Sequence, residues 1–260
     1  MTSEIPESPA APGAPHPAAT APGTAPYDGE AADLARPPVT LVVLDMAGTT
    51  VADGGLVEEA FSRAVRRLGV EPGSEVYERQ LDYVRATMGE SKITVFRALF
   101  GAEDRARAAN SAFEEAYAEL VDSGLCAPLP GAEDAVRELR ADGRKVVLTT
   151  GFARTTQDAI LAALGWQDLA DLTLCPADAG RGRPHPDMVL TALLRTGTGA
   201  VRQVAAAGDT ASDIRSALRA GAAVAAGVTT GAHTADQLHA AGATHVLASV
   251  ADLPALLRER

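Results

Sequence analysis

Apolar and polar positions follow two different periods along most of the chain. Short apolar runs, rich in Val, Leu and Ala as in strands buried on both faces, occur at residues 39–44, 145–149, 172–175, 201–207, 224–228 and 245–247. Between most of these runs the apolar residues recur at helical spacing, for example at 131–141, 155–164, 187–195 and 212–220. Such alternation is typical of an α/β protein, and it predicts a doubly wound parallel sheet.

One long stretch, residues 56–128, interrupts this alternation. It contains only helical patterns, such as the spacing of Phe113, Tyr117 and Leu120. We interpret it as a helical cap inserted between the first and second strands of the core. The predicted α/β core then comprises residues 37–55 and 129–260.

The first 36 residues are mostly Ala, Pro, Gly, Ser and Thr, with few bulky apolar side chains. Burial in such a segment cannot offset the entropy lost on ordering, so we predict a disordered tail. No apolar run reaches the roughly 18 residues of a membrane span, and the N-terminus lacks the apolar core of a signal peptide. Cys126 and Cys175 follow no metal or redox spacing. We therefore expect a cytoplasmic protein with reduced thiols and no membrane contact.

Charge narrows the possible partners of the protein. The net charge is −11, and no basic patch is available to neutralise a phosphate backbone, which argues against nucleic-acid binding. An anionic small molecule remains possible because a metal ion and a few donors can dominate the local field.

Polar residues follow four of the predicted strands. They are Asp45, Gly48 and Thr49 after the first, Thr149, Thr150 and Gly151 after the second, Arg183 after the third, and Asp209 and Asp213 after the fourth. Because the loops after the strands of a doubly wound sheet meet at one crevice, we expect these groups to converge.

The combination of carboxylates, hydroxyls and a guanidinium is suited to phosphoryl transfer. Asp45 can act as a nucleophile and form an aspartyl-phosphate. Asp45, Asp209 and the backbone carbonyl of Ala47 can hold Mg²⁺, and Asp213 can orient the waters of the metal. Phosphoryl oxygens can bind Arg183 in a bidentate manner and can accept hydrogen bonds from the loops, namely from Gly48, Thr49, Thr149, Thr150 and Gly151.

In their order and spacing these segments resemble the haloacid dehalogenase superfamily of phosphohydrolases, over residues 39–252. The resemblance implies a Rossmann-like core with a cap inserted after the first motif. Most phosphatases of this kind carry a second aspartate two residues after the nucleophile, as general acid for the leaving oxygen. Ala47 occupies that position here, which points to a leaving group that needs no proton there.

The segment Met88–Lys92 is similar to the lysine segment of the phosphonoacetaldehyde hydrolases (phosphonatases), which also have alanine at the position of Ala47. In that family the lysine forms an imine with the substrate aldehyde, and the carbon–phosphorus bond then breaks. The resemblance therefore implies a catalytic Lys92, a substrate-lining Met88, a small phosphonate or phosphorylated substrate, and a homodimer formed through the cap.

Three positions depart from the phosphonatase pattern, and the substrate therefore stays open. Val95, Phe152 and Gly55 stand where that family tends to have histidine, tyrosine and cysteine. A phosphate-monoester phosphatase of the phosphoglycolate type is one alternative, and a non-catalytic phosphate-binding protein is another. His233, like His239 and His245, lacks ligand spacing and is expected on the surface or in the core.

Overall fold

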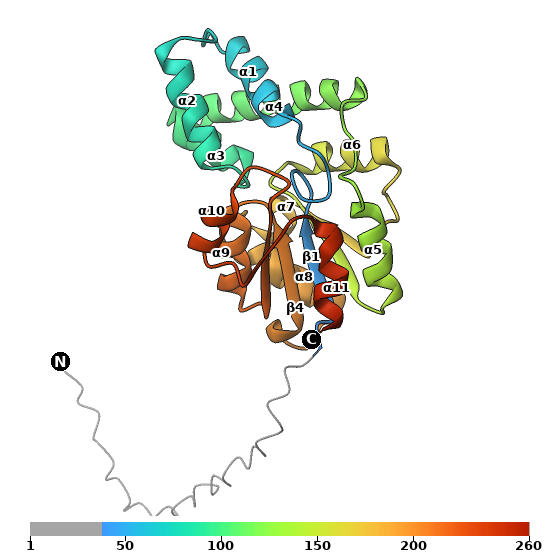
Figure 1. Cartoon of the computed structure of the whole chain (residues 1–260). Coiled ribbons are helices and arrows are strands. Elements are labelled where there is room, and N and C mark those ends of the chain that lie inside the picture. Colours follow the sequence, from blue (N-terminus) through green and yellow to red (C-terminus); the bar gives the residue numbers. More distant parts are fainter. Residues whose placement is uncertain (1–37, 260) are drawn as a thin grey trace, which may run out of the picture. The chain divides into compact units, whose positions relative to one another are not determined.

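The computed structural model describes residues 38–259, so the tail predicted at residues 1–36 lies outside the described part. Six strands form one sheet in the order β3-β2-β1-β4-β5-β6, and every neighbouring pair is parallel (Figure 1). The strands are β1 Leu41–Asp45, β2 Lys145–Thr149, β3 Leu172–Leu174, β4 Val204–Gly208, β5 Val224–Val228 and β6 His245–Leu247. The predicted doubly wound parallel sheet is confirmed.

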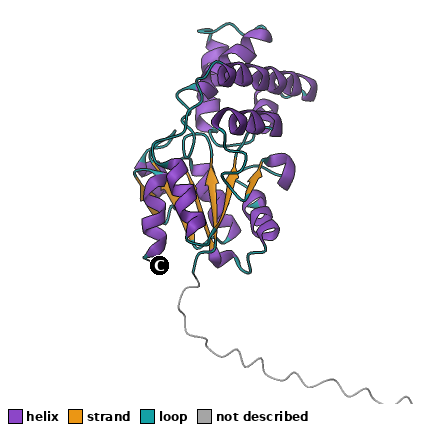
Figure 2. Cartoon of the chain, turned by 90° about the vertical axis from the view of Figure 1, so that its right-hand side faces the viewer, coloured by secondary structure: helices purple, strands orange, loops and turns teal. Residues whose placement is uncertain are grey.

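Both faces of the sheet are covered by helices (Figure 2). Successive residues of β1 point to opposite faces, so that Leu41 and Val43 belong to one apolar cluster and Val42 and Leu44 to the other. The first face packs against α8 Asp187–Thr196, α9 Ala211–Ala220 and α10 Ala235–Ala240, and the second against α5 Ala132–Ala141, α6 Arg154–Leu164 and α11 Leu253–Arg258. The short helix α7 Pro176–Ala179 follows β3.

The bounds of β1, β3 and β4 differ from those expected by one to three residues. The run at 201–207 begins as a single 3₁₀ turn, Val201–Gln203, and becomes β4 only at Val204. Pairing with β1 starts there, because Leu41 is aligned with Val204 and the N–H of Thr40 donates to the carbonyl of Gln203 at 2.9 Å. β1 in turn runs through Asp45, which places this carboxylate on the last residue of a central, buried strand.

Five helices lie between β1 and β2 in the sequence, and the first four precede α5 of the core: α1 Leu56–Arg67, α2 Glu75–Ala86, α3 Lys92–Phe100 and α4 Glu103–Asp122. We call these first four helices the helical insert, and they lie beyond the carboxyl ends of the strands (Figure 1). Phe96 stacks on Phe61 and meets Phe113 edge to face, with ring centroids 6.2 and 5.9 Å apart. Phe113 and Tyr117 also contact Phe152 of the core, so one apolar cluster continues from the insert into the sheet.

Among the described residues, no helix combines the length and the apolar character that crossing a bilayer would require.

Candidate active site

The loop after β1 is shaped by a close approach to Asp209. Gly48 has a φ of +81°, and a Cβ atom there would lie 2.4 Å from Oδ2 of Asp209. Only glycine fits both this backbone conformation and this gap. The next residue, Thr49, donates its hydroxyl to Oδ1 of Asp209 at 3.3 Å. The loop after β1 thus contacts Asp209, the residue that follows the neighbouring strand β4.

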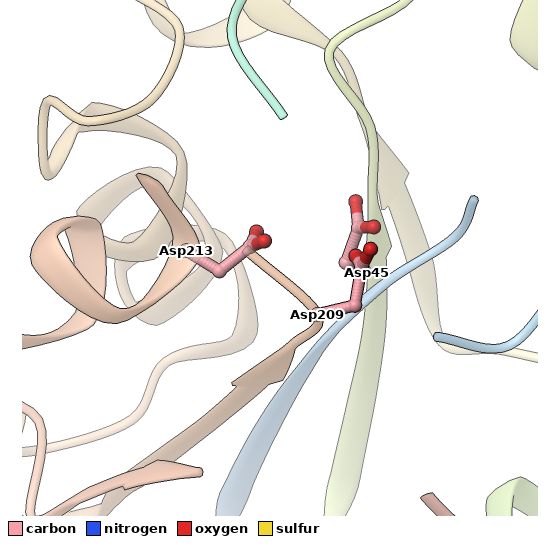
Figure 3. Close-up of side chains that lie close together, drawn as sticks. All are labelled: Asp45, Asp209 and Asp213. Atoms are coloured by element: carbon pink, nitrogen blue, oxygen red, sulfur yellow. The ribbon is translucent and has the colours of Figure 1, made fainter. Parts of the chain in front are cut away.

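Three buried carboxylates meet at these strand ends: Asp45, Asp209 and Asp213 (Figure 3). One carboxylate oxygen from each lies within 4.8 Å of the others. Burial raises the pKa of Asp45 well above its usual range, against the opposing effect of Arg183. Burial and the charge of Asp213 raise the pKa of Asp209 to about 7. Three carboxylates meet a single guanidinium, that of Arg183, and their oxygen atoms suit a hard divalent cation, so the cluster could hold a metal ion.

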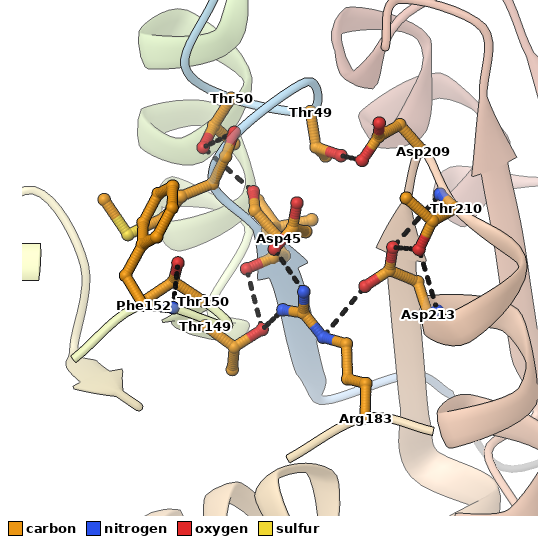
Figure 4. A network of polar contacts seen from close by, with 12 residues as sticks. Asp45, Thr49, Thr50, Thr149, Thr150, Phe152, Arg183, Asp209, Thr210 and Asp213 are labelled. Carbon is orange, nitrogen blue, oxygen red and sulfur yellow. Dashed lines mark hydrogen bonds and ion pairs between the residues drawn. The ribbon is translucent and has the colours of Figure 1, made fainter. Parts of the chain in front are cut away.

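Arg183 is the single cation within this cluster, and Figure 4 shows how it is held. Its Nη1 atom lies 2.6 Å from Oδ1 of Asp45, and its Nε atom lies 2.9 Å from Oδ1 of Asp213. Its Nη2 donates to the hydroxyl of Thr149 at 2.6 Å. Three donors of the guanidinium are therefore bonded to protein, which fixes the orientation of the Asp45 carboxylate and leaves fewer donors for a ligand.

Asp213 is held from both sides. Besides its contact with Arg183, its Oδ2 atom accepts hydrogen bonds from the N–H and the hydroxyl of Thr210, at 3.1 and 2.5 Å. These bonds form a capping box at the start of α9. The carboxylate is thereby immobilised beside Asp45 and Asp209.

A cavity of about 940 Å³ opens above the carboxylates, between the strand ends and the helical insert. Eight of the predicted site residues line it: Asp45, Ala47, Met88, Lys92, Thr150, Gly151, Arg183 and Asp209. Gly48, Thr49, Thr149 and Asp213 are not among its lining residues. The hydroxyl of Thr149 donates to the carbonyl of Leu44 at 3.3 Å and accepts from Arg183, so it is used inside the protein.

Lys92 enters the cavity from the first residue of α3. Its Nζ atom lies 5.4 Å from the ring centroid of Phe152 and 6.0 Å from that of Phe113. Burial among these rings lowers its pKa, while the carboxylates of Asp53 and Asp45 act in the opposite direction. Nowhere in residues 38–259 does an acid form an ion pair with it, so its amino group is free to meet a ligand.

The turn before α3 is docked on the core at three glycines. A Cβ atom on Gly89 would lie 2.3 Å from the Thr210 hydroxyl, and one on Gly151 would lie 2.6 Å from the Glu90 carbonyl. A third, on Gly182, would lie 2.8 Å from Cβ of Ser91. The N–H of Lys92 also donates to the carbonyl of Gly151 at 3.3 Å. This packing sets the position of Lys92 relative to the strand ends.

Sequence reasoning missed several polar residues that line the same cavity, among them Asp53, Thr210, Arg215 and His233. Asp53 accepts the N–H of Val57 at 3.3 Å near the start of α1, and burial raises its pKa. His233 was expected on the surface or in the core, yet it follows β5, and the strand-end rule that identified Asp45 and Asp209 could have found it. Asp53 carries no such signal because it lies near the far end of the loop between β1 and α1.

Comparison with known proteins agrees with this architecture. Residues 39–221 match the model of the haloacid dehalogenase-like hydrolases. The chain is 31% identical over 233 residues to a probable phosphatase, IndB, of Dickeya dadantii, covering 82% of this chain and 97% of that protein. It is 28% identical over 194 residues to a phosphonoacetaldehyde hydrolase of Bacillus cereus, covering 70% of this chain and 73% of that one.

A solved structure gives the same result for the fold. The crystal structure of a phosphonoacetaldehyde hydrolase like protein from Oleispira antarctica aligns with a TM-score of 0.73 at 26% identity, over 86% of this chain and 93% of that one. The family match covers well over half of the sequence and includes Asp45, Arg183 and Asp209 within its bounds. The chain therefore belongs to the haloacid dehalogenase-like hydrolases, and it is an enzyme rather than a non-catalytic phosphate-binding protein.

Proposed function

We propose that the protein hydrolyses the carbon–phosphorus bond of phosphonoacetaldehyde or a related aldehyde phosphonate. The observation that carries the proposal is the place of Lys92: its amino group is enclosed in the cavity that also contains Asp45 and makes no ion pair in the described part of the chain. Several relatives at 27–32% identity are named phosphonoacetaldehyde hydrolases, which supports this reading.

The lysine content of the chain gives further support. Lys92 and Lys145 are the only lysines in the 260-residue sequence, which otherwise uses arginine for its basic residues. Lys145 is exposed and pairs with Asp171 at 3.1 Å. A guanidinium keeps its proton and cannot form an imine, whereas a buried amine can lose its proton and react with a carbonyl. Lysine at position 92 therefore fits a chemical role that arginine could not fill.

In the proposed reaction, neutral Lys92 adds to the aldehyde carbon, and loss of water gives a protonated imine. Asp45 attacks phosphorus, and the electron pair of the carbon–phosphorus bond moves into the imine to leave an enamine on Lys92 and an aspartyl-phosphate on Asp45. Protonation and hydrolysis of the enamine release acetaldehyde, and water releases phosphate from Asp45. The leaving group is an enamine rather than an alkoxide, so the reaction does not need a general acid at the position of Ala47.

The carboxylate cluster and Arg183 supply the electrostatic part of the mechanism. Arg183 holds Oδ1 of Asp45 at 2.6 Å and so orients the attacking carboxylate. Asp45 and Asp209, with the backbone carbonyl of Ala47, would hold Mg²⁺. The ion would supply the positive charge that keeps Asp45 ionised and draws the phosphoryl oxygens to it.

The test is to incubate phosphonoacetaldehyde with Mg²⁺ and the protein and to measure phosphate and acetaldehyde. We expect equal amounts of both products from the wild type and from Lys145→Arg, and a loss of about a thousandfold or more in Lys92→Arg because no imine can form. Borohydride added during turnover should attach the reduced two-carbon group to Lys92 alone, as peptide mass spectrometry would show. Full activity of Lys92→Arg would contradict the proposal.

A second candidate, a phosphate-monoester phosphatase, is favoured by the match to the probable phosphatase IndB, which covers more of this chain than the phosphonoacetaldehyde hydrolases do. It predicts phosphate release from phosphoglycolate or a similar ester that survives in Lys92→Arg. The same two variants therefore separate the candidates.

A further inference from the structure

Four cations line the active-site cavity, and they differ in their partners: Arg183, Arg85, Lys92 and Arg215. Arg183 is bound between Asp45 and Asp213, and Arg85 forms a bidentate pair with Glu58 at 2.9 and 2.7 Å. In the proposed reaction, Lys92 forms an imine with the aldehyde carbon of the substrate. Arg215 is left without a carboxylate within ion-pair distance anywhere in the described structure.

Arg215 occupies the outer part of the cavity. It lies on α9 one turn after Ala211, and its side chain is exposed, whereas Asp213 on the same helix is buried in the carboxylate cluster. α9 thus carries Asp213 in the buried carboxylate cluster and Arg215 in the lining of the cavity. A planar guanidinium with free donors is the side chain best suited to bind a carboxylate in a bidentate manner.

His233 adds a second donor beside Arg215. Its Nδ1 atom accepts the N–H of Ala211 at 2.9 Å, so the ring proton lies on Nε2. Nε2 has no acceptor among residues 38–259, and His233 lines the same cavity as Arg215. Ala211, which His233 contacts, lies one turn before Arg215 on α9, so the imidazole packs on the same end of the helix that carries Arg215.

We propose that Arg215 and His233 form a second subsite, which binds a carboxylate at the end of the substrate opposite the phosphoryl group. The proposal rests on the proposed function in one respect: the phosphoryl group occupies the end of the cavity at Asp45. The cavity of about 940 Å³ has room for such a substrate, because cavities of this size enclose ligands much larger than a two-carbon phosphonate.

Glu90 of the helical insert offers a competing explanation. Arg215 lies near enough to lower the pKa of Glu90, although burial has the larger effect and raises it. If Arg215 served to hold the insert against the core through Glu90, its loss would weaken the binding of every ligand, and Glu90→Gln would have the same effect. A carboxylate subsite instead affects only ligands that carry the carboxylate.

Calorimetry of the full chain with Mg²⁺ can separate these possibilities. The ligands are phosphonoacetate, phosphonopropanoate and phosphonobutanoate, each compared with the alkylphosphonate that lacks the carboxylate. None has an aldehyde, so none can form an imine with Lys92. The variants are Arg215→Gln, His233→Asn, Glu90→Gln and, as a matched exposed arginine outside the cavity, Arg202→Gln.

We expect the carboxylate to tighten binding about tenfold in the wild type and in Arg202→Gln, at the chain length that reaches Arg215. Arg215→Gln should abolish this gain and leave the alkylphosphonates unchanged, and His233→Asn, which keeps an acceptor for Ala211, should reduce it. The subsite is refuted if the carboxylate brings no gain at any length, or if Arg215→Gln and Glu90→Gln weaken all ligands equally. If neither alkylphosphonates nor inorganic phosphate bind at all, the proposed function itself fails, and the subsite fails with it.

Discussion

Lys92 and Asp53 are of opposite charge, and burial brings their pKa values closer together. Burial lowers the pKa of the amine and raises that of the carboxyl. Asp53 is also the carboxylate that acts most strongly to keep Lys92 protonated. One Oδ atom of Asp53 accepts the N–H of Val57, so the carboxylate is held in place near the start of α1. Asp53 therefore opposes the effect of burial and reduces the fraction of Lys92 in the neutral, nucleophilic form.

Asp53→Asn should lower the pKa of Lys92 further, because the favourable charge is lost while the amide oxygen still accepts from Val57. The measurement is the pH dependence of acetylation by acetic anhydride, followed for Lys92 by peptide mass spectrometry. Lys145 in the same chain serves as an internal standard. Glu58→Gln, at the rim of the cavity, is the control variant and should leave the profile of Lys92 nearly unchanged. A pKa that rises or stays constant in Asp53→Asn would show that Asp53 does not stabilise the ammonium form.

At the scale of elements, the turn before α3 is the part that brings the helical insert to the strand ends. It packs on the core loops through Gly89, Gly151 and Gly182, where no Cβ atom fits without displacing its neighbour. Gly151 does not have a positive φ, so only space, and not backbone strain, keeps it a glycine. The close approach at Gly151 thus serves to place Lys92 rather than to form the fold.

Gly151→Ala should push the Glu90 carbonyl away and shift Lys92, and activity should fall about tenfold to a hundredfold because misplacement of a reacting group by about an ångström has such effects. The midpoint of thermal unfolding should also fall, because the atom that must move belongs to the backbone. Gly199→Ala is the matched control, since its added Cβ would meet only the end of the Gln203 side chain, at 3.3 Å. Kinetics and thermal unfolding of both variants test this, and unchanged kinetics in Gly151→Ala would mean that the turn is not fixed by the contact.

At the scale of the whole molecule, the buried carboxylate cluster opposes folding when no cation balances it. Asp209 has a pKa of about 7 in the folded protein and an ordinary, much lower value in the unfolded chain. Between these two values the folded state binds more protons than the unfolded state, so the free energy of unfolding decreases as the pH rises. A cation bound by the ionised carboxylates should reverse this loss.

In the presence of a chelator, the wild type should lose on the order of 3 kcal/mol of stability between about pH 4 and pH 7, relative to Asp209→Asn. Mg²⁺ should stabilise the wild type more at about pH 7 than at about pH 5, because protons compete with the metal for the carboxylates. Urea unfolding of the two proteins at each pH, with and without Mg²⁺, measures both effects. Equal pH dependence in the two proteins would argue against the raised pKa of Asp209.

The sequence by itself determined the class of fold and the chemistry of the strand ends. The short apolar runs of the strands and the helical spacing elsewhere depend on neighbours in the sequence, so six strands and the helices between them could be predicted to within a few residues. Because the carboxyl ends of parallel strands meet at one edge, Asp45, Arg183 and Asp209 could be expected to meet. The β4 boundary was wrong by three residues, since pairing with β1 decides where that strand begins.

Only the tertiary structure decided which groups share the cavity. Lys92 and Asp53 belong to segments separated by 39 residues, and Arg215 and His233 come from different elements of the core. Their proximity depends on the packing of the helical insert and of the loop after β5, which no local pattern encodes. The hydroxyl of Thr149 likewise contacts Arg183 rather than the cavity, because its orientation depends on a partner 34 residues away. Periodicity and strand ends are local properties of the chain, whereas the partners of a buried side chain are set by the packing of distant segments.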